Sequence, residues 1–185
     1  DRKHILEAGI SITENGTRWT GLEEREHDQG QHDEVKTVLA VSTAGMLVKR
    51  SLFEELGGFD PSLELFRDDI DLGWRANIAG HSVICVGEAI LYHAEAAASE
   101  RRSVDVKDAI LHRPLLLDRR NAALVLLANS SWWILPWVAI QLLFTSIGRA
   151  ILYLLAKLPG YAADEIAAIG LLIFKPADLI KSRRY

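Results

Sequence analysis

The feature that most constrains this chain is an abrupt loss of charge late in the sequence. Charged residues are dense up to Arg120, and none occurs from residue 121 to residue 148. Residues 122–147 form an apolar run of roughly 25 residues, which at about 1.5 Å per residue is long enough to cross a bilayer core of about 30 Å. Because 185 residues suit one ordinary domain, we expect a polar domain followed by a membrane-associated helical segment.

The apolar run carries its own signals of interruption and of orientation. Polar residues 129–131 and Pro136 break its apolar character, so one uninterrupted helix is not expected. Tryptophans cluster near one end, as in the aromatic belt at a membrane–water interface. These residues are Trp132, Trp133 and Trp137.

Three placements of this segment remain open from the sequence. One is an interfacial helix up to Leu127, then a span over residues 132–155 in which Arg149 lies near an end and extends its charge to the interface. A second is a re-entrant or surface-lying pair of helices, and a third is a buried helical hairpin of a soluble protein. Residues 164–185 predict a basic amphipathic helix beside the membrane, broken at Lys175–Pro176.

Composition excludes several functional classes. The net charge is −4, and no basic face indicates nucleic acid as a partner. A single cysteine, Cys85, cannot build a disulfide framework or a cysteine zinc site. The chain starts at Asp1 without a signal peptide, and we expect it to be a fragment.

The amino-terminal region contains one unusual loop. Residues 23–33 are rich in acids and contain two histidines. A metal site is conceivable there, but the spacing matches no known ligand pattern. We favour a solvated loop, of a length that often faces substrate.

The middle of the chain predicts alternating strands and helices. Residues 35–48 are β-branched and apolar, interrupted by the small residues 42–45, and residues 82–86 and 89–92 are two further strand-like runs. A helix is predicted from residue 68 to about residue 79. This order favours an α/β sheet with a site at the strand ends.

Three carboxylates open that helix, at Asp68, Asp69 and Asp71. One carboxylate would suffice to cap a helix and to interact with its dipole. Three together raise one another's proton affinity and can hold a general base or a metal. Asp71 and Arg75 are four residues apart and can form an ion pair.

The apolar residues of the same helix suggest which side faces the core. Ile70, Trp74 and Ile78 recur every four residues and predict a buried stripe. Asp68 and Asp69 lie away from this stripe, so we expect them to face a cleft.

Four segments in this region resemble a known family. Residues 44–50 (Ala-Gly-Met-Leu-Val-Lys-Arg) are followed by residues 56–60 (Leu-Gly-Gly-Phe-Asp), residues 68–75 (Asp-Asp-Ile-Asp-Leu-Gly-Trp-Arg) and residues 89–93 (Ala-Ile-Leu-Tyr-His). In this order and spacing they resemble the carboxyl-terminal half of the catalytic domain of family 2 glycosyltransferases. The resemblance implies an α/β fold, a partial Rossmann-like GT-A domain, followed by membrane-associated α-helices.

The resemblance implies inverting transfer of a sugar from a nucleotide-sugar donor to the hydroxyl of a glycan or lipid-linked acceptor. By position, Asp69 matches the catalytic base and Asp68 its acidic neighbour. His93 matches a histidine that ligates a divalent metal, Mg²⁺ or Mn²⁺, in some members. Such a metal would stabilise the leaving diphosphate.

Further positions match the substrate-binding side of the family. The Gly58 turn would shape the acceptor face, and Gly45 would allow the backbone close to a sugar. Trp74 would support the helix beside the substrate. The candidate substrate-binding residues are Gly45, Gly58, Asp60 and Trp74.

The family's nucleotide-binding half, with its Asp-x-Asp metal motif, has no counterpart before residue 42. We therefore expect residues 1–115 to be the acceptor-side part of the catalytic domain, missing its amino-terminal partner half and inactive alone. Residues 116–158 would be a spanning or re-entrant membrane segment, and residues 159–185 a basic amphipathic tail. We expect a plasma-membrane location with the catalytic part in the cytoplasm, and a role in cell-envelope or cell-wall glycan synthesis.

Two other functions compete with this interpretation. The chain could be a membrane-anchored interaction module with a degenerate GT-A fold, whose acidic side chains would be dispersed or engaged in ion pairs. It could also be a metal-dependent hydrolase, with three or more of its carboxylates and His93 around a common point within metal-ligand distance.

Overall fold

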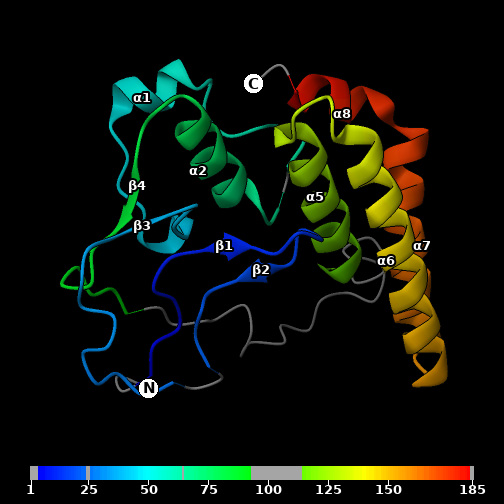
Figure 1. The fold of residues 1–185 in the computed structure, drawn as a ribbon, viewed down its shortest axis with the longest axis horizontal. Coiled ribbons are helices and arrows are strands. Elements are labelled where there is room, and N and C mark those ends of the chain that lie inside the picture. The colour runs from blue at the N-terminus through cyan, green and yellow to red at the C-terminus, as the bar shows by residue number, and fades with distance from the viewer. Residues whose placement is uncertain (1–3, 24–25, 64, 93–113, 184–185) are drawn as a thin grey trace, which may run out of the picture.

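The structure, a computed structural model, describes residues 4–23, 26–63, 65–92 and 114–183. Strands and two helices form one side of the molecule, and four carboxyl-terminal helices form the other (Figure 1). The described elements in chain order are β1 (Ser11–Ile12), β2 (Arg18–Trp19), β3 (Lys36–Val38), the 3₁₀ helix η1 (Thr43–Gly45), α1 (Arg50–Glu55), α2 (Asp68–Ile78), β4 (Val83–Cys85), α5 (Pro114–Asn129), α6 (Leu135–Leu155), α7 (Pro159–Phe174) and α8 (Pro176–Ser182).

The described strands form two small antiparallel sheets. In the first, β1 pairs with β2 through a turn at Asn15–Gly16, and Gly16 adopts a φ of 76° that favours glycine. In the second, β3 pairs with β4, with Thr37 opposite Ile84. The predicted α/β character is therefore met in part, because the described strands are short and antiparallel.

Two of the predicted strand regions differ from the structure. Beyond β3, residues 42–45 turn into η1, where the Ser42 hydroxyl accepts a hydrogen bond from the Ala44 N–H at 3.3 Å. Such a local side-chain bond competes with sheet pairing. Residues 89–92 also contain no strand, so the predicted second run after β4 was wrong.

Helix α2 begins and ends where the sequence predicts. It packs closely on residues 39–40, because a Cβ on Gly73 would lie 2.5 Å from the Leu39 carbonyl oxygen. The Asn77 amide donates to that same oxygen at 3.1 Å. The predicted apolar stripe is only partly correct, since Ile70 is buried but Ile78 is 64% exposed.

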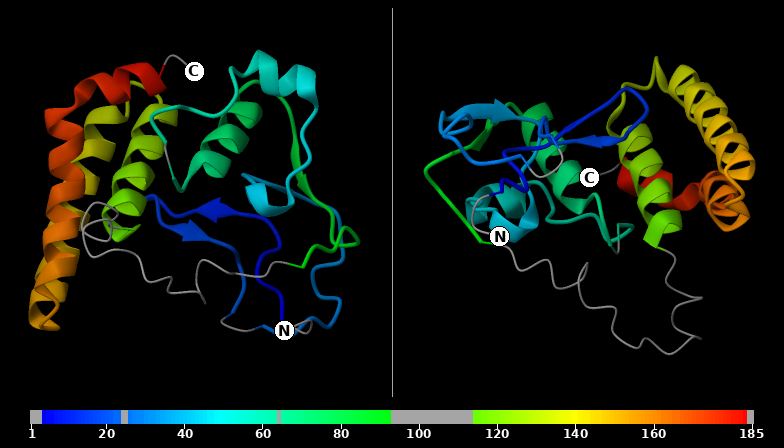
Figure 2. Two further views of the ribbon diagram at one scale, coloured as in Figure 1. Left: turned by 180° about the vertical axis from the view of Figure 1, so that it is seen from behind. Right: turned by 90° about the horizontal axis from the view of Figure 1, so that it is seen from below.

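Helix α5 is the central element of the fold. Both views in Figure 2 place it between α2 and the α6–α7 pair, which forms the outer side of the molecule. One face of α5 joins a core cluster with Ile10, Ala40 and Ile70, through Leu124. A second face packs on α6, through Leu127 and neighbouring side chains. The amino-terminal half of the chain therefore depends on α5 for its core.

The breaks between the carboxyl-terminal helices follow from sequence signals. After α5, the Ser130 hydroxyl donates to the Leu126 carbonyl at 2.6 Å, and the Arg183 guanidinium donates to the Leu127 carbonyl at 2.5 Å. The Leu126 carbonyl also accepts the Ser130 N–H at 3.1 Å, so of these two bonds the one from Arg183 satisfies a carbonyl that the helix end leaves free. Pro159 and Pro176 each open the next helix, where the missing N–H costs nothing.

Among the described helices, α6 alone is long and apolar enough to cross a membrane. Most of its side chains are exposed, and Trp132, Trp133 and Trp137 are exposed near its start. One of the three open placements extends Arg149 toward a membrane interface. Its guanidinium instead contacts the fully buried Glu165 of α7 at 3.1 Å, and Arg119 of α5 contacts the same carboxylate at 2.7 Å.

Candidate active site

The backbone just before α2 adopts an unfavourable conformation. Phe66 and Arg67 have φ angles of 67° and 70°, in the left-handed region that residues with a side chain rarely enter. Arg67 is the residue that caps α2, and its side chain makes no capping bond. Two such residues in succession cost on the order of 1–3 kcal/mol each, so surrounding contacts must hold them.

Helix α5 and the β1–β2 turn supply those contacts. The Arg67 guanidinium donates to both carboxylate oxygens of Asp118, at 2.8 and 3.1 Å, and to the Gly16 carbonyl at 3.2 Å. The Asn121 amide donates to the carbonyl of Phe66 at 3.2 Å. The turn that presents Asp68 and Asp69 is therefore clamped by residues more than fifty positions away in sequence.

Asp69 lies at the first turn of α2 and is 8% exposed. Its Oδ1 accepts the Ile70 N–H at 2.8 Å. Burial raises the pKa of the Asp69 carboxyl above its ordinary value, and the nearby Asp68 and Glu7 carboxylates raise it further, while Arg18 lowers it. A carboxylate with a raised pKa is a better proton acceptor near neutral pH.

Glu7 and Arg18 connect the Asp69 region to the amino-terminal segment. Arg18, on β2, forms an ion pair with Glu7. The second Glu7 oxygen accepts the Ser42 N–H at 2.8 Å, at the start of η1. Three segments that are distant in sequence, around Glu7, Arg18 and Ser42, thus meet near the start of α2. The predicted site included neither Glu7 nor Arg18, because no spacing in the sequence links them to Asp69.

Asp71 has a structural role. It is 2% exposed and forms an ion pair with Arg75 at 2.7 Å, as the sequence spacing predicts. Its other oxygen accepts the Asn129 amide at 2.9 Å. Arg75 also donates to the carbonyl of Gly58 at 2.8 Å. This network joins α2 to α5 and to the turn after α1, and it engages both oxygens of Asp71.

The predicted substrate-binding residues occupy different surroundings. Gly58 has a φ of 77° and belongs to the turn held by Arg75. Trp74 packs against the core clusters around α5. Gly45 ends η1, with Leu91 3.5 Å from the position of an added Cβ. Asp60 is buried and lines a cavity that does not include Asp69. His93 lies outside the described residues.

The described part of the charged loop, residue 23 and residues 26–33, is organised around Glu26. Its carboxylate accepts bonds from the Gln31 amide at 2.7 Å and the Glu23 N–H at 2.9 Å, and lies 3.0 Å from His32. These contacts lower the pKa of Glu26 to about 2, the Gln31 bond contributing most. The contacts explain the local order of the loop without a ligand.

Comparison with known proteins identifies the family. Residues 15–106, about half of the chain, match the model described as glycosyltransferase like family 2. The chain belongs to the family 2 glycosyltransferases. The matched residues include β2, α1 and the whole of α2 with its strained entry turn.

Two relatives of this glycosyltransferase chain are informative. It is 32% identical over 79 residues to the O-antigen biosynthesis protein RfbC of Myxococcus xanthus, covering 43% of this chain and 6% of that protein. It is also 32% identical over 98 residues to the N-acetylglucosaminyl-diphospho-decaprenol L-rhamnosyltransferase of Mycobacterium tuberculosis, covering 52% of this chain and 29% of that protein. The chain thus matches under a third of either relative. No solved structure matches it significantly.

Family 2 glycosyltransferases often use a divalent metal. Within the parts of this glycosyltransferase chain that the structure describes, no three His, Cys, Asp or Glu side chains are grouped as metal ligands. Asp71 is engaged by Arg75 and Asn129, which leaves Asp68 and Asp69 as the available neighbouring carboxylates. The described residues therefore do not form a complete metal site, and a metal would need ligands from elsewhere.

Proposed function

We propose that this chain is the acceptor-side part of a glycosyltransferase that builds cell-envelope glycans, with Asp69 as the catalytic base. The observation that carries the proposal is the burial of Asp69 behind a clamped, strained turn, without an ion-pair partner among the described residues. Strain of this kind is concentrated at functional sites. The family membership and the names of the two relatives support the reaction class.

The proposed reaction requires one proton transfer within this chain. The acceptor hydroxyl oxygen attacks the anomeric carbon of the donor sugar, and the bond from that carbon to the nucleotide diphosphate breaks with inversion. The hydroxyl proton passes to Asp69, whose Oδ2 remains available because Oδ1 accepts the Ile70 N–H. Asp68 raises the pKa of Asp69 and so favours this transfer. A divalent metal, Mg²⁺ or Mn²⁺, would stabilise the leaving diphosphate in the full-length enzyme.

We further propose that the donor half of the enzyme lies outside this chain, and that the acceptor is lipid-linked. One relative is named for a lipid-diphosphate substrate, and α6 offers an apolar, largely exposed helix suited to membrane contact. We place the protein at the plasma membrane with its catalytic part in the cytoplasm. The Arg119–Glu165–Arg149 cluster, in which Glu165 is fully buried, would then lie between helices, where charged groups in membrane proteins are usually paired.

The test is the Asp69→Asn variant of the full-length enzyme. We expect turnover to fall by about 10²–10⁴-fold, the usual contribution of a general base, with donor binding unchanged. A matched control is Glu54→Gln, an exposed carboxylate on α1 that pairs with Arg50. Normal turnover by Asp69→Asn would refute the base assignment. Absence of transfer by the unmodified full-length protein would favour the interaction module.

A further inference from the structure

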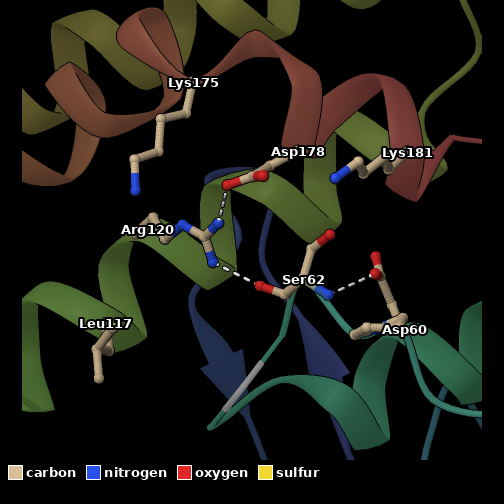
Figure 3. A pocket seen from close by; sticks show the side chains of 8 residues that line it. Asp60, Ser62, Leu117, Arg120, Lys175, Asp178 and Lys181 are labelled. Carbon is tan, nitrogen blue, oxygen red and sulfur yellow. Dashed lines mark hydrogen bonds and ion pairs between the residues drawn. The ribbon is translucent and has the colours of Figure 1, made fainter.

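A cavity of about 390 Å³ lies outside the site described above. It opens between the turn after α1, the first turns of α5 and the junction of α7 with α8. This volume is within the range of about 300–1,000 Å³ typical of small-molecule sites. Figure 3 shows the polar residues that line it: Asp60, Ser62, Arg120, Lys175, Asp178 and Lys181.

Two lysines give this cavity an unbalanced positive charge. Arg120 is already engaged, because it contacts Asp178 at 2.6 Å and donates to the Ser62 carbonyl at 2.6 Å. Lys175 and Lys181 lie on either side of this ion pair (Figure 3). Neither ammonium has an acidic partner among the described residues. The lining carries three cations (Arg120, Lys175 and Lys181) and two carboxylates (Asp60 and Asp178). This net positive charge favours an anion with several acceptor oxygens, such as a phosphate.

The wall beside Lys181 carries an unsatisfied acceptor on Asp60 (Figure 3). Asp60 is 2% exposed, and its Oδ1 accepts the Ser62 N–H at 2.8 Å. Its Oδ2 is buried without a hydrogen-bond partner within the described residues. A buried carboxylate oxygen left unpaired costs free energy that a ligand donor would recover. A carboxylate repels a phosphate but accepts a hydroxyl, so this wall suits the sugar portion of a ligand.

We propose that this cavity binds a phosphorylated sugar. Lys175 and Lys181 hold its phosphate, and a sugar hydroxyl donates a hydrogen bond to the Asp60 carboxylate. The inference goes beyond the proposed function, because a ligand in a cavity that does not include Asp69 is not the acceptor whose hydroxyl Asp69 deprotonates. It assigns a binding role to α8 and to the α7–α8 junction, which lie outside the segment that matches the family. The cavity is separate from Asp69, so binding here can be measured without turnover.

The experiment measures binding of α-D-glucose 1-phosphate and inorganic phosphate to the full chain by isothermal titration calorimetry. We expect the double variant Lys175→Gln/Lys181→Gln to weaken both ligands by about tenfold or more. The matched control is Lys49→Gln/Lys157→Gln, which removes two exposed lysines that do not line the cavity. Equal binding by the two double variants would overturn the proposal.

Asp60→Asn tests the sugar contact separately. Asn retains an oxygen that accepts the Ser62 N–H, so the turn is kept. Its amide nitrogen cannot accept a hydrogen bond from a sugar hydroxyl. We expect this variant to bind inorganic phosphate more tightly than the native chain does. The ratio of its affinity for glucose 1-phosphate to its affinity for inorganic phosphate should fall toward unity. An unchanged preference would overturn the sugar assignment.

A second arm distinguishes the source of the phosphate. Vesicles of phosphatidylcholine with phosphatidic acid compete with glucose 1-phosphate if a lipid phosphate enters the cavity, and do not compete if the ligand is soluble. Because no arm uses turnover, loss of activity in Asp69→Asn and loss of binding in the lysine variant are independent outcomes.

Discussion

Replacing Arg75 by Met tests whether the network under the candidate site holds the amino-terminal half together. Arg75 is 6% exposed and its ion-pair partner Asp71 is 2% exposed. Met fills similar space but donates no hydrogen bond. The variant leaves the Asp71 charge buried, and the carbonyls of Leu56 and Gly58 each lose the hydrogen bond that Arg75 donates to them.

The expected cost follows from this burial. Removing one partner of a buried ion pair typically costs about 3–5 kcal/mol, because the remaining charge is left uncompensated. For a chain of this size each kcal/mol lowers the Tm by roughly 2–4 °C. We therefore expect a Tm lower by roughly 6–20 °C. Removing both charges, in Asp71→Leu/Arg75→Met, should cost less than removing Arg75 alone.

The assay is chemical and thermal unfolding of the full chain followed by circular dichroism. The control is Arg50→Met, which breaks an ion pair with Glu54 at the same four-residue spacing but on the exposed helix α1. Exposed helix pairs contribute about 0.3–0.5 kcal/mol. If Arg75→Met shifts the unfolding midpoint no further than Arg50→Met does, the inferred role of the network is wrong.

Three further perturbations test the site, the helix packing and the membrane face. Burial raises the pKa of Asp69, so the folded state prefers the protonated carboxyl and loses stability as the pH rises above about 3.8. The Asp69→Asn variant lacks this loss, so its free energy of unfolding should rise relative to that of the native chain between acid and neutral pH. Gly73→Ala should cost about 1–3 kcal/mol, because its Cβ would lie 2.5 Å from a carbonyl oxygen, whereas Gly170→Ala on α7 meets no neighbour. Phe144→Ser, on the exposed face of α6, should weaken co-flotation with vesicles more than Val35→Ser.

Each of these has a result that contradicts it. A pH-independent difference between Asp69→Asn and the native chain would show that the carboxyl is not perturbed by burial. Equal unfolding midpoints for Gly73→Ala and Gly170→Ala would show that α2 can move away from residues 39–40. Equal flotation of Phe144→Ser and Val35→Ser would exclude the α6 face as the membrane contact.

Much of the helical structure is predictable because its signals are local. The limits of α2, the Asp71–Arg75 pair and the helix break at Pro176 each depend on residues within one or two turns of one another. The family motifs, such as the turn at Gly58, are equally local. The strand predictions were weaker, since a strand depends on a partner elsewhere in the chain. Of the predicted β region at residues 35–48, only Lys36–Val38 forms a strand.

The predicted division of the chain at residues 115 and 116 remains a prediction, but α5 bears on it. This helix falls within the segment predicted to enter the membrane, and it packs against α2 while Asp118 and Asn121 hold the turn before Asp69. Apolar composition alone does not distinguish a helix that faces lipid from one that faces a protein core.

By itself, the sequence determined which residues are candidates for the site: the acids at the start of α2 and the family motifs around them. It also located an apolar segment after Arg120. Only the tertiary structure decided what surrounds those residues. It buried Asp69 beside Glu7 and Arg18, turned Arg149 toward Glu165, and formed the cavity between Asp60 and the lysines of the last helices. The physical reason is sequence distance, because burial and long-range charge contacts arise only when separate segments pack together.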